Sequence, residues 1–216
     1  MPDGGAATQS LERCPCPWAC TRRFGGYIGT MHISDAIPAR RSIKRFTDRP
    51  VTREHIETML EAAVHAPNHR LTQPWRFYVL GPDARYRYGL ALGDRKARKI
   101  PDPETAQAMR EKVAEEHRAL PAMIAVAMVL HDDAEIREED YAAVMMAVQN
   151  LSLTAVSLGL GTHIKTGAIM SDPAARAATG VAEQERIIAV VNAGEPVESL
   201  PPSSRRPASE LTTFTP

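Results

Sequence analysis

The middle of the sequence holds two long apolar segments in succession, and together they limit the folds open to the chain. The first, Met123–Leu130, is a continuous apolar run of strand length, typical of a central strand covered on both faces. The second, from Glu138 to about Leu158, carries apolar residues around most of its helical circumference, so we expect it to be buried in a core or at a subunit interface. Gln149 and Asn150 within it argue against a membrane span, and Gly159 is expected to end it.

Shorter helix and strand patterns alternate on either side of this pair. Helices are expected from Ser34 to Arg41, from Thr52 to Val64, over residues 103–119 and from Ser171 to Gly180, and strands at Arg76–Leu80, Thr162–Ile169 and Glu185–Pro196. Ser34 and Thr52 are the expected N-caps of the first two helices, and Pro67 is expected to stop the second. Alternation of this kind in 216 residues predicts one α/β or α+β domain.

The two ends of the chain differ from this pattern. Residues 1–30 are rich in Gly, Pro and Cys and show no steady period, so we expect a disordered N-terminal extension ahead of a single domain at 31–216. Residues from about 197 to 216 are rich in Pro and Ser. This composition predicts an extended C-terminal arm that must pack on something else.

All three cysteines, Cys14, Cys16 and Cys20, lie in the N-terminal extension. Their spacing lacks a fourth Cys or His placed as in zinc motifs, so no metal site is predicted. No cysteine follows Met31, so the domain has no disulfide, which fits a reducing cytoplasm.

Composition and motifs argue against several classes of function. The net formal charge is zero, which gives no support to a nucleic-acid-binding surface, and no apolar run reaches the length of a membrane span. There is no Walker loop, HExxH or GxSxG motif, and Gly159-x-Gly161 follows a helix, whereas a dinucleotide fingerprint follows a strand. His65 and His69 are spaced i, i+4, but Pro67 disrupts the helix that would align them on zinc.

Two polar clusters remain as candidate sites. The segment "ARRSIKRF" concentrates Arg40, Arg41 and Ser42 near a predicted helix end. Cations are favoured at a helix C-terminus, and the same residues suit a phosphate clamp, because Arg offers a bidentate fork and Ser a hydroxyl. The loop "HAPNHRLTQPW" crowds hydrogen-bonding groups beside an indole. Trp75 is expected to pack in the core, whereas Gln73 suits either a ligand contact or a role in fixing the loop backbone.

The stretch "RRSIKRFTDRPVTREHIETMLEAAVHAPNHRLTQPWRFYVL" resembles the opening of the nitroreductase family. That family shows R-R-S-x-R-x-F, then P-V, a helix ending in E-A-A-x-x-A-P, a polar loop and Q-P-W-x-F. Weaker agreement continues through the long helix, "GLGT" and "NAGEP", so the resemblance covers Met31 to about Pro196. The loop is most similar to that of the compact NAD(P)H nitroreductases, which carry His there.

The resemblance implies an α+β fold with a central mixed β-sheet flanked by helices. It also implies an obligate homodimer with the long helix at its interface, one FMN in each of two interfacial clefts, and NAD(P)H as co-substrate. Carried over by position, the FMN-binding residues are Arg40, Arg41, Ser42, His65, His69, Ile164, Lys165 and Thr166.

The last three of these residues depart from the family pattern. A relative has Trp-Arg-Ser where this chain has Ile164, Lys165 and Thr166. A cation and a hydroxyl are kept, but an indole that would stack on the flavin is lost, so substrate preference is expected to differ. Lys165 suits either the stabilisation of negative charge on a reduced flavin or a surface salt bridge.

The function that the resemblance implies is an FMN-dependent NAD(P)H oxidoreductase. Hydride would pass from NAD(P)H to flavin N5 and then, in ping-pong order, to a nitroaromatic, a quinone or a similar small acceptor, with no catalytic side chain. Two alternatives stay open. One is a dehydrogenase or reductive dehalogenase on the same fold, for which residues 93–119 are the place for a substrate-binding insert, and the other is a flavin-binding module without catalysis. The sequence does not choose between NADH and NADPH or identify the acceptor.

Overall fold

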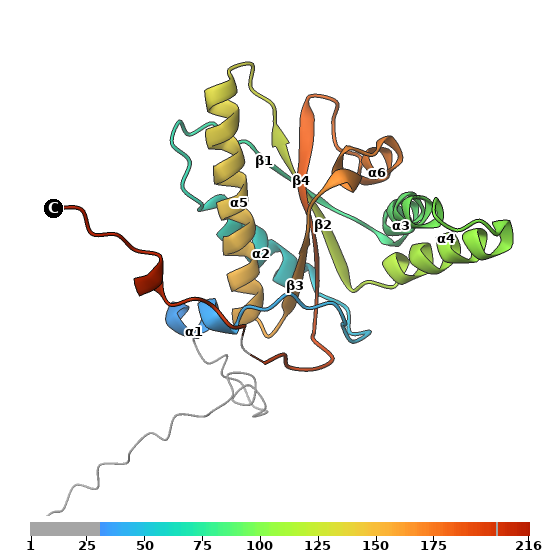
Figure 1. The fold of residues 1–216 in the computed structure, drawn as a ribbon, viewed down its shortest axis with the longest axis horizontal. Coiled ribbons are helices and arrows are strands. Elements are labelled where there is room, and N and C mark those ends of the chain that lie inside the picture. The colour runs from blue at the N-terminus through green and yellow to red at the C-terminus, as the bar shows by residue number, and fades with distance from the viewer. Residues whose placement is uncertain (1–30, 202) are drawn as a thin grey trace, which may run out of the picture.

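The computed structural model describes residues 31–201 and 203–216, which form a four-stranded sheet between two layers of helices (Figure 1). The strands are β1 (Trp75–Val79), β2 (Ala122–Val129), β3 (Gly161–Lys165) and β4 (Glu185–Gly194). The helices are α1 (Ile33–Ala39), α2 (Arg53–Val64), α3 (Pro82–Ala97), α4 (Pro103–Arg118), α5 (Ala134–Ser157) and α6 (Pro173–Thr179), with short 3-10 helices η2 (Ala168–Ser171) and η3 (Ala208–Glu210). The predicted α+β class is confirmed. The predicted N-terminal extension and its three cysteines lie outside the described residues.

The sheet has the strand order β1-β2-β4-β3, and neighbouring strands all pair antiparallel. The family resemblance predicts a mixed sheet, but within the described residues parallel pairing is limited to an isolated bridge between Ser42 and Thr162. Two helices, α3 and α4, connect β1 to β2 and return the chain to the end of the sheet that it left, which makes these neighbours antiparallel. β2 is buried along almost its whole length, as its continuous apolar run predicts.

Each face of the sheet is covered by its own helical layer. α2 and α5 cover one face, whereas α3 and α6 cover the other, and α4 packs against α3 (Figure 1). Side chains of β2 point alternately to the two faces of the sheet. Ile124 and Val126 pack in the core beneath α5, whereas Met123 and Ala125 pack in the core beneath α3. No helix in the described part of the chain is long and apolar enough to cross a membrane.

α5 begins four residues before its predicted start because Asp133 caps it. The Asp133 carboxylate accepts hydrogen bonds from the backbone N–H groups of Glu135 (2.8 Å) and Ile136 (3.2 Å), an arrangement that stabilises a helix N-terminus. The helix ends as predicted, with Gly159 at a φ of +74° just beyond it. Within a single chain the helix is not buried all round, since Tyr141 and Met146 are 41% and 39% exposed, and burial of these residues at a subunit interface stays a prediction.

α3 was not predicted from the sequence, although Pro82 directly after Gly81 marks its start. α3 and α4 pack closely because two glycines of α3 face the backbone of α4. A Cβ on Gly89 would lie 2.7 Å from the Ala114 Cα, and one on Gly93 would lie 2.8 Å from the Arg110 Cα. Residues 93–119, considered as the place for a substrate-binding insert, are therefore part of a helical pair that is packed on the sheet.

The predicted N-caps of the first two helices have different outcomes. Thr52 caps α2, and its Oγ1 accepts a hydrogen bond from the His55 backbone N–H (3.2 Å). Ser34 lies inside α1, which begins at Ile33 after His32, and the His32 side chain makes no capping hydrogen bond. The prediction for Ser34 was wrong because the chain enters the helical conformation two residues earlier than the capping preference indicates.

A pair of facing glycines lets the segment after α1 cross the end of the sheet. Gly161 of β3 pairs with Gly194 of β4, and a Cβ on Gly161 would collide with the Ile43 side chain. The crossing is held by hydrogen bonds from the Ile43 N–H to the Thr162 carbonyl and from the Thr47 N–H to the Glu195 carbonyl, each 2.9 Å. The glycines of "GLGT" and "NAGEP" thus allow residues 42–47 to lie against β3 and β4.

The C-terminal arm leaves the body and extends into solvent beyond α1 (Figure 1). Its apolar side chains are open, with Phe214 91% and Leu211 64% exposed. η3 lies within it and is stabilised by local bonds such as that from the Arg206 Nε to the Glu210 carboxylate (3.2 Å). Within the described chain the arm buries little of its own apolar surface.

Candidate functional site

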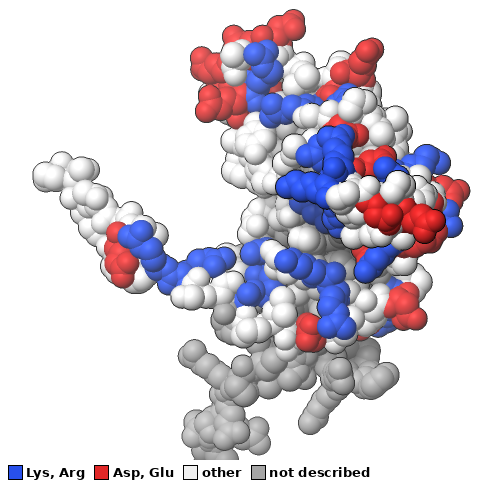
Figure 2. Space-filling view, turned by 45° about the vertical axis from the view of Figure 1, so that its right-hand side comes forward, with Lys and Arg blue, Asp and Glu red and all other residues white. Residues whose placement is uncertain are grey.

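The basic segment after α1 lies against β3. Arg40 ends α1 as its C-cap and is half-buried, and Ser42 forms the bridge to Thr162. Arg41 donates a hydrogen bond from Nη1 to the carbonyl of Pro201, where the C-terminal arm begins. Lys and Arg side chains gather in the part of the body from which the arm leaves (Figure 2). The structure thus brings Arg40, Arg41 and Ser42 together with the strand that carries Ile164 and Lys165.

A buried hydroxyl without a partner lies at this bridge. Thr162 is 1% exposed, and its Oγ1 makes no hydrogen bond within the described residues. A buried polar atom is normally paired with protein or water. Together with the cations of the neighbouring segment, this hydroxyl provides a donor set that fits an anionic group such as a phosphate.

The pleat of β3 directs its predicted site residues to opposite faces of the sheet. Ile164 packs against the core beneath α5, whereas the Lys165 Nζ lies 3.0 Å from the His117 Nε2 of α4. Thr166 follows the strand and is exposed. Side chains alternate along a strand, so Ile164 and Lys165 cannot contact one ligand from the same face. Of the two roles considered for Lys165, a surface salt bridge is not formed within the described residues, where Lys165 instead makes a part-buried contact with His117. The flavin contact stays a prediction.

Burial decides the charge states of this pair. Burial, with a smaller effect of the Lys96 charge, lowers the pKa of Lys165 to about 8. Burial and the positive charge of Lys165 lower the pKa of His117 to about 4. His117 is therefore neutral at pH 7, its Nδ1–H donates to the Val113 carbonyl (2.7 Å), and its Nε2 accepts from Lys165.

This pair predicts an acid-sensitive contribution to stability. The pKa of His117 is lower in the folded chain, about 4, than the 6.5 of an ordinary histidine, so the unfolded chain binds more protons between these values. Stability from this group is full above pH 6.5 and is lost as the pH falls toward 4. We expect wild type to lose about 2–3 kcal/mol more than His117→Gln over this range. Urea unfolding of both proteins at pH 6.5 and at pH 4 measures the free energy of unfolding. Equal losses of stability in wild type and in His117→Gln would contradict the prediction.

The loop between α2 and β1 is organised by Asn68. Its Oδ1 accepts a hydrogen bond from the Gln73 backbone N–H (2.7 Å), and its Nδ2 donates to the Thr72 Oγ1 (3.1 Å). Leu71 and Gln73 have φ values of 51° and 45°, a left-handed conformation uncommon for residues with side chains. Gln73 therefore takes part in fixing the loop backbone, one of the two roles considered for it. Trp75, at the loop exit, is buried in the core as predicted.

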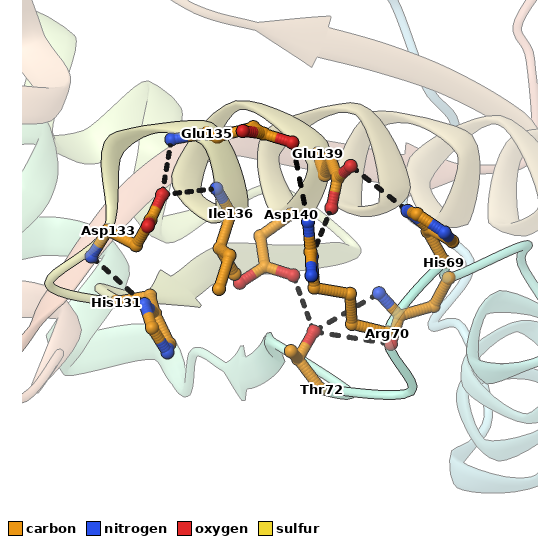
Figure 3. A network of polar contacts seen from close by, with 10 residues as sticks. His69, Arg70, Thr72, His131, Asp133, Glu135, Ile136, Glu139 and Asp140 are labelled. Carbon is orange, nitrogen blue, oxygen red and sulfur yellow. Dashed lines mark hydrogen bonds and ion pairs between the residues drawn. The ribbon is translucent and has the colours of Figure 1, made fainter.

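Acidic residues of α5 hold this loop in place (Figure 3). One Glu139 oxygen lies 3.0 Å from the His69 Nδ1, and the other accepts a hydrogen bond from the Arg70 Nε (2.8 Å). The next residue, Asp140, is buried and accepts a hydrogen bond from the Thr72 hydroxyl. Hydrogen bonds from His69 and Arg70 hold the pKa of Glu139 below its usual value, so Glu139 is ionised at neutral pH.

The second predicted histidine lies at the other end of the loop. His65 is the C-cap of α2 and is exposed, with its Nε2 3.4 Å from the Glu61 carboxylate. A cavity of about 420 Å³ opens between this loop and α5, and it is lined by Pro67, Asn68, His69, Glu139, Ala142 and Met146. The cavity therefore joins polar groups of the loop to Ala142 and Met146, which together with Tyr141 form an exposed stripe on α5.

Within one chain, the predicted residues form two separate groups. His69 contacts Glu139 near the start of α5, whereas β3 and the bridge to Ser42 follow directly after the end of that helix. The helix from Glu139 to Ser157 rises roughly 27 Å. Figure 1 shows the loop before β1 near one end of α5, and α1 with β3 near the other. One chain therefore does not bring all eight residues to one small ligand.

Several polar residues of these groups were not predicted from the sequence. Glu139 and Asp140 belong to an acidic run that reads as a solvated helix face, and His117 lies in a charged helix. Their roles depend on contacts with residues distant in the sequence, namely the loop before β1 and the end of β3. The Thr162 hydroxyl has no distinguishing local pattern either.

Comparison with known proteins gives consistent matches along this chain. The model of the nitroreductase family matches residues 37–195. A relative from Bacillus subtilis, named "Putative NAD(P)H nitroreductase YfhC", is 31% identical over 184 residues, covering 84% of this chain and 93% of its own. The solved structure of a nitroreductase-like family protein from Bacillus cereus is 27% identical with a TM-score of 0.74, covering 89% of this chain and 99% of that chain. A Desulfovibrio desulfuricans protein solved in complex with FMN is 29% identical with a TM-score of 0.64, over 85% of this chain and 96% of that one.

Proposed function

The chain belongs to the nitroreductase family, and on that premise we propose that it is an FMN-dependent NAD(P)H oxidoreductase that reduces nitroaromatic, quinone or similar small acceptors. The observation that carries the proposal is the basic segment Arg40–Ser42 lying against β3 beside the unpartnered Thr162 hydroxyl. A relative named as an NAD(P)H nitroreductase and a similar structure in complex with FMN support it.

The residues of this chain fit FMN in chemical character. Arg40 and Ser42, with the Thr162 hydroxyl, would hold the phosphate, because an anion is bound most strongly by charge-assisted and hydroxyl hydrogen bonds. His65 and His69 would meet the polar edge of the ring, and Ile164 offers it an apolar surface. When bound, FMN supplies the redox chemistry, accepting hydride from NAD(P)H and passing electrons to the acceptor. The residues of the chain bind the flavin and orient it, and they shield it from water.

The proposed site is shared between two copies of the chain. The cationic segment Arg40–Ser42 and the histidine loop with His65 and His69 lie at opposite ends of α5. One end of a single chain therefore offers only one of these two groups of FMN-binding residues. A twofold axis across the exposed stripe of α5 would run the two helices antiparallel. It would bring the loop of one protomer toward the cationic segment of its partner. The exposed Tyr141 and Met146 of that stripe would then be buried in the interface.

One experiment tests the reaction class directly. The purified protein, reconstituted with FMN, is mixed anaerobically with NADPH or with NADH, and the flavin absorbance is followed. We expect rapid bleaching with at least one of them, then recovery when a nitroaromatic or a quinone is added. Bound flavin that neither reductant bleaches would favour the non-catalytic module, and bleaching by an organic substrate alone would favour a dehydrogenase. The relative rates with the two reductants give the nucleotide preference.

A further inference from the structure

Glu139 lies between the histidine loop and the cavity and makes two directed contacts. One oxygen of its carboxylate accepts a hydrogen bond from the Arg70 Nε (2.8 Å). The other oxygen lies 3.0 Å from the His69 Nδ1. The Glu139 side chain is 28% exposed and that of His69 is 70% exposed. The carboxylate is thus a fixed, partly buried group, whereas the histidine has room to present its ring to a ligand (Figure 3).

The chemistry of the carboxylate determines which ring nitrogen of His69 carries the proton. Hydrogen bonds from His69 and Arg70 hold the pKa of Glu139 below its usual value, and an ionised carboxylate only accepts hydrogen bonds. The His69 Nδ1 must therefore be protonated to bond to it. In the neutral ring the Nε2 then carries a lone pair and acts as an acceptor.

We propose that Glu139 is a positioning residue: by accepting the Nδ1–H of His69, it keeps the Nε2 as a hydrogen-bond acceptor for a ligand that presents an N–H donor, such as the imide of an isoalloxazine. Arg70 completes the device, because its bond to the second oxygen stops the carboxylate from turning away. The proposal rests on the proposed function, since it takes FMN as the ligand.

The first test reads the tautomer in the absence of any flavin. Long-range proton–nitrogen correlation spectra of the histidine rings, assigned with His69→Gln, are recorded for the wild-type apoprotein and for Glu139→Ala. The Nδ1–H tautomer is expected in wild type. In the variant the ring should revert to the Nε2–H form that predominates in free histidine. A wild-type His69 in the Nε2–H form, or an unchanged tautomer in Glu139→Ala, would overturn the proposal.

The second test reads FMN affinity by quenching of flavin fluorescence. Glu139→Ala is expected to weaken FMN binding about tenfold, the lower end of the loss seen when a residue that orients a metal-binding histidine is removed. Glu135→Ala is the matched control: Glu135 contacts Arg70 at 3.4 Å but not His69, so affinity should stay within about twofold. In a His69→Ala background, Glu139→Ala should cost nothing further, because it acts through that ring.

The outcomes separate this inference from the proposed function. Additive losses in the double variant, or a Glu135→Ala loss as large as that of Glu139→Ala, would show general loosening of the loop and overturn the positioning role. Circular dichroism and thermal melting of each variant confirm that the fold is retained. A wild-type protein that binds no FMN would overturn the proposed function, while the ring spectra would still decide whether Glu139 sets the tautomer of His69.

Discussion

Met146→Glu is expected to give a folded, monomeric protein that has lost most of its FMN. Met146 is 39% exposed in the single chain, and it lines the cavity beside His69 and Ala142. If α5 forms the proposed interface, the substitution buries an unpaired carboxylate on both sides of the twofold axis. Leaving a buried charge unpaired costs about 3–5 kcal/mol, so the dimer dissociation constant should rise at least roughly a hundredfold. Cofactor should be lost in parallel, because each protomer alone holds half of the donors.

Light scattering combined with the ratio of flavin to protein absorbance reads both effects in one measurement. Leu130→Glu is a suitable control, because Leu130 is 41% exposed but lies directly after β2 and is not part of α5. This control should stay dimeric and keep its FMN. Circular dichroism establishes that Met146→Glu is folded. A well-folded monomer that retains full FMN would refute the shared site, and a variant that stays dimeric would place the interface elsewhere.

The elements that were predicted from the sequence are those that local pattern determines. β2 is a continuous apolar run and is buried along almost its whole length. The start of α6 is set by Asp172 before Pro173, and its end by Gly180 at a φ of +71°. These features depend on a few neighbouring residues, because capping, proline geometry and left-handed glycine act within one turn. α3 was missed because Gly89 and Gly93 interrupt its helical pattern. These glycines are explained only by the close packing of α4 against them, which leaves no room for a Cβ.

The candidate site was predictable only in part, for a related reason. The resemblance names Arg40–Ser42 and the histidine loop, and the structure places the first against β3 as a paired segment. The direction of Lys165 was not predictable, because the pleat of β3 sends it to His117, 48 residues away in the sequence. Glu139 was overlooked because an acidic helix start looks solvated until the loop folds over it. The direction of Lys165 and the role of Glu139 depend on contacts between segments that are distant in the sequence, and neither composition nor local pattern reveals such contacts.

Arg40→Ala is expected to weaken FMN binding ten- to a hundredfold. Arg40 is half-buried next to the bridge between Ser42 and Thr162, and within the described chain it makes no ion pair that would occupy its charge. The neighbouring Arg41 is already bonded to the Pro201 carbonyl, so Arg40 is the freer cation for a phosphate. Losing a charge-assisted hydrogen bond to an anion costs about 1.5–3 kcal/mol, which corresponds to this change in affinity.

Comparing two flavins isolates the phosphate contact from the rest of the site. Riboflavin lacks the phosphate, so Arg40→Ala should lower the affinity for FMN while leaving the weaker affinity for riboflavin nearly unchanged. Arg45→Ala is the matched control, because Arg45 is an exposed arginine of the same segment that pairs with Glu198 at 3.5 Å. It should change neither affinity by more than about twofold, as expected for a surface ion pair. If Arg40→Ala weakened FMN and riboflavin equally, Arg40 would be shaping the segment, and its charge would not be contacting a phosphate. An unchanged FMN affinity would return Arg40 to the alternative considered from the sequence, a solvated cation at the end of α1.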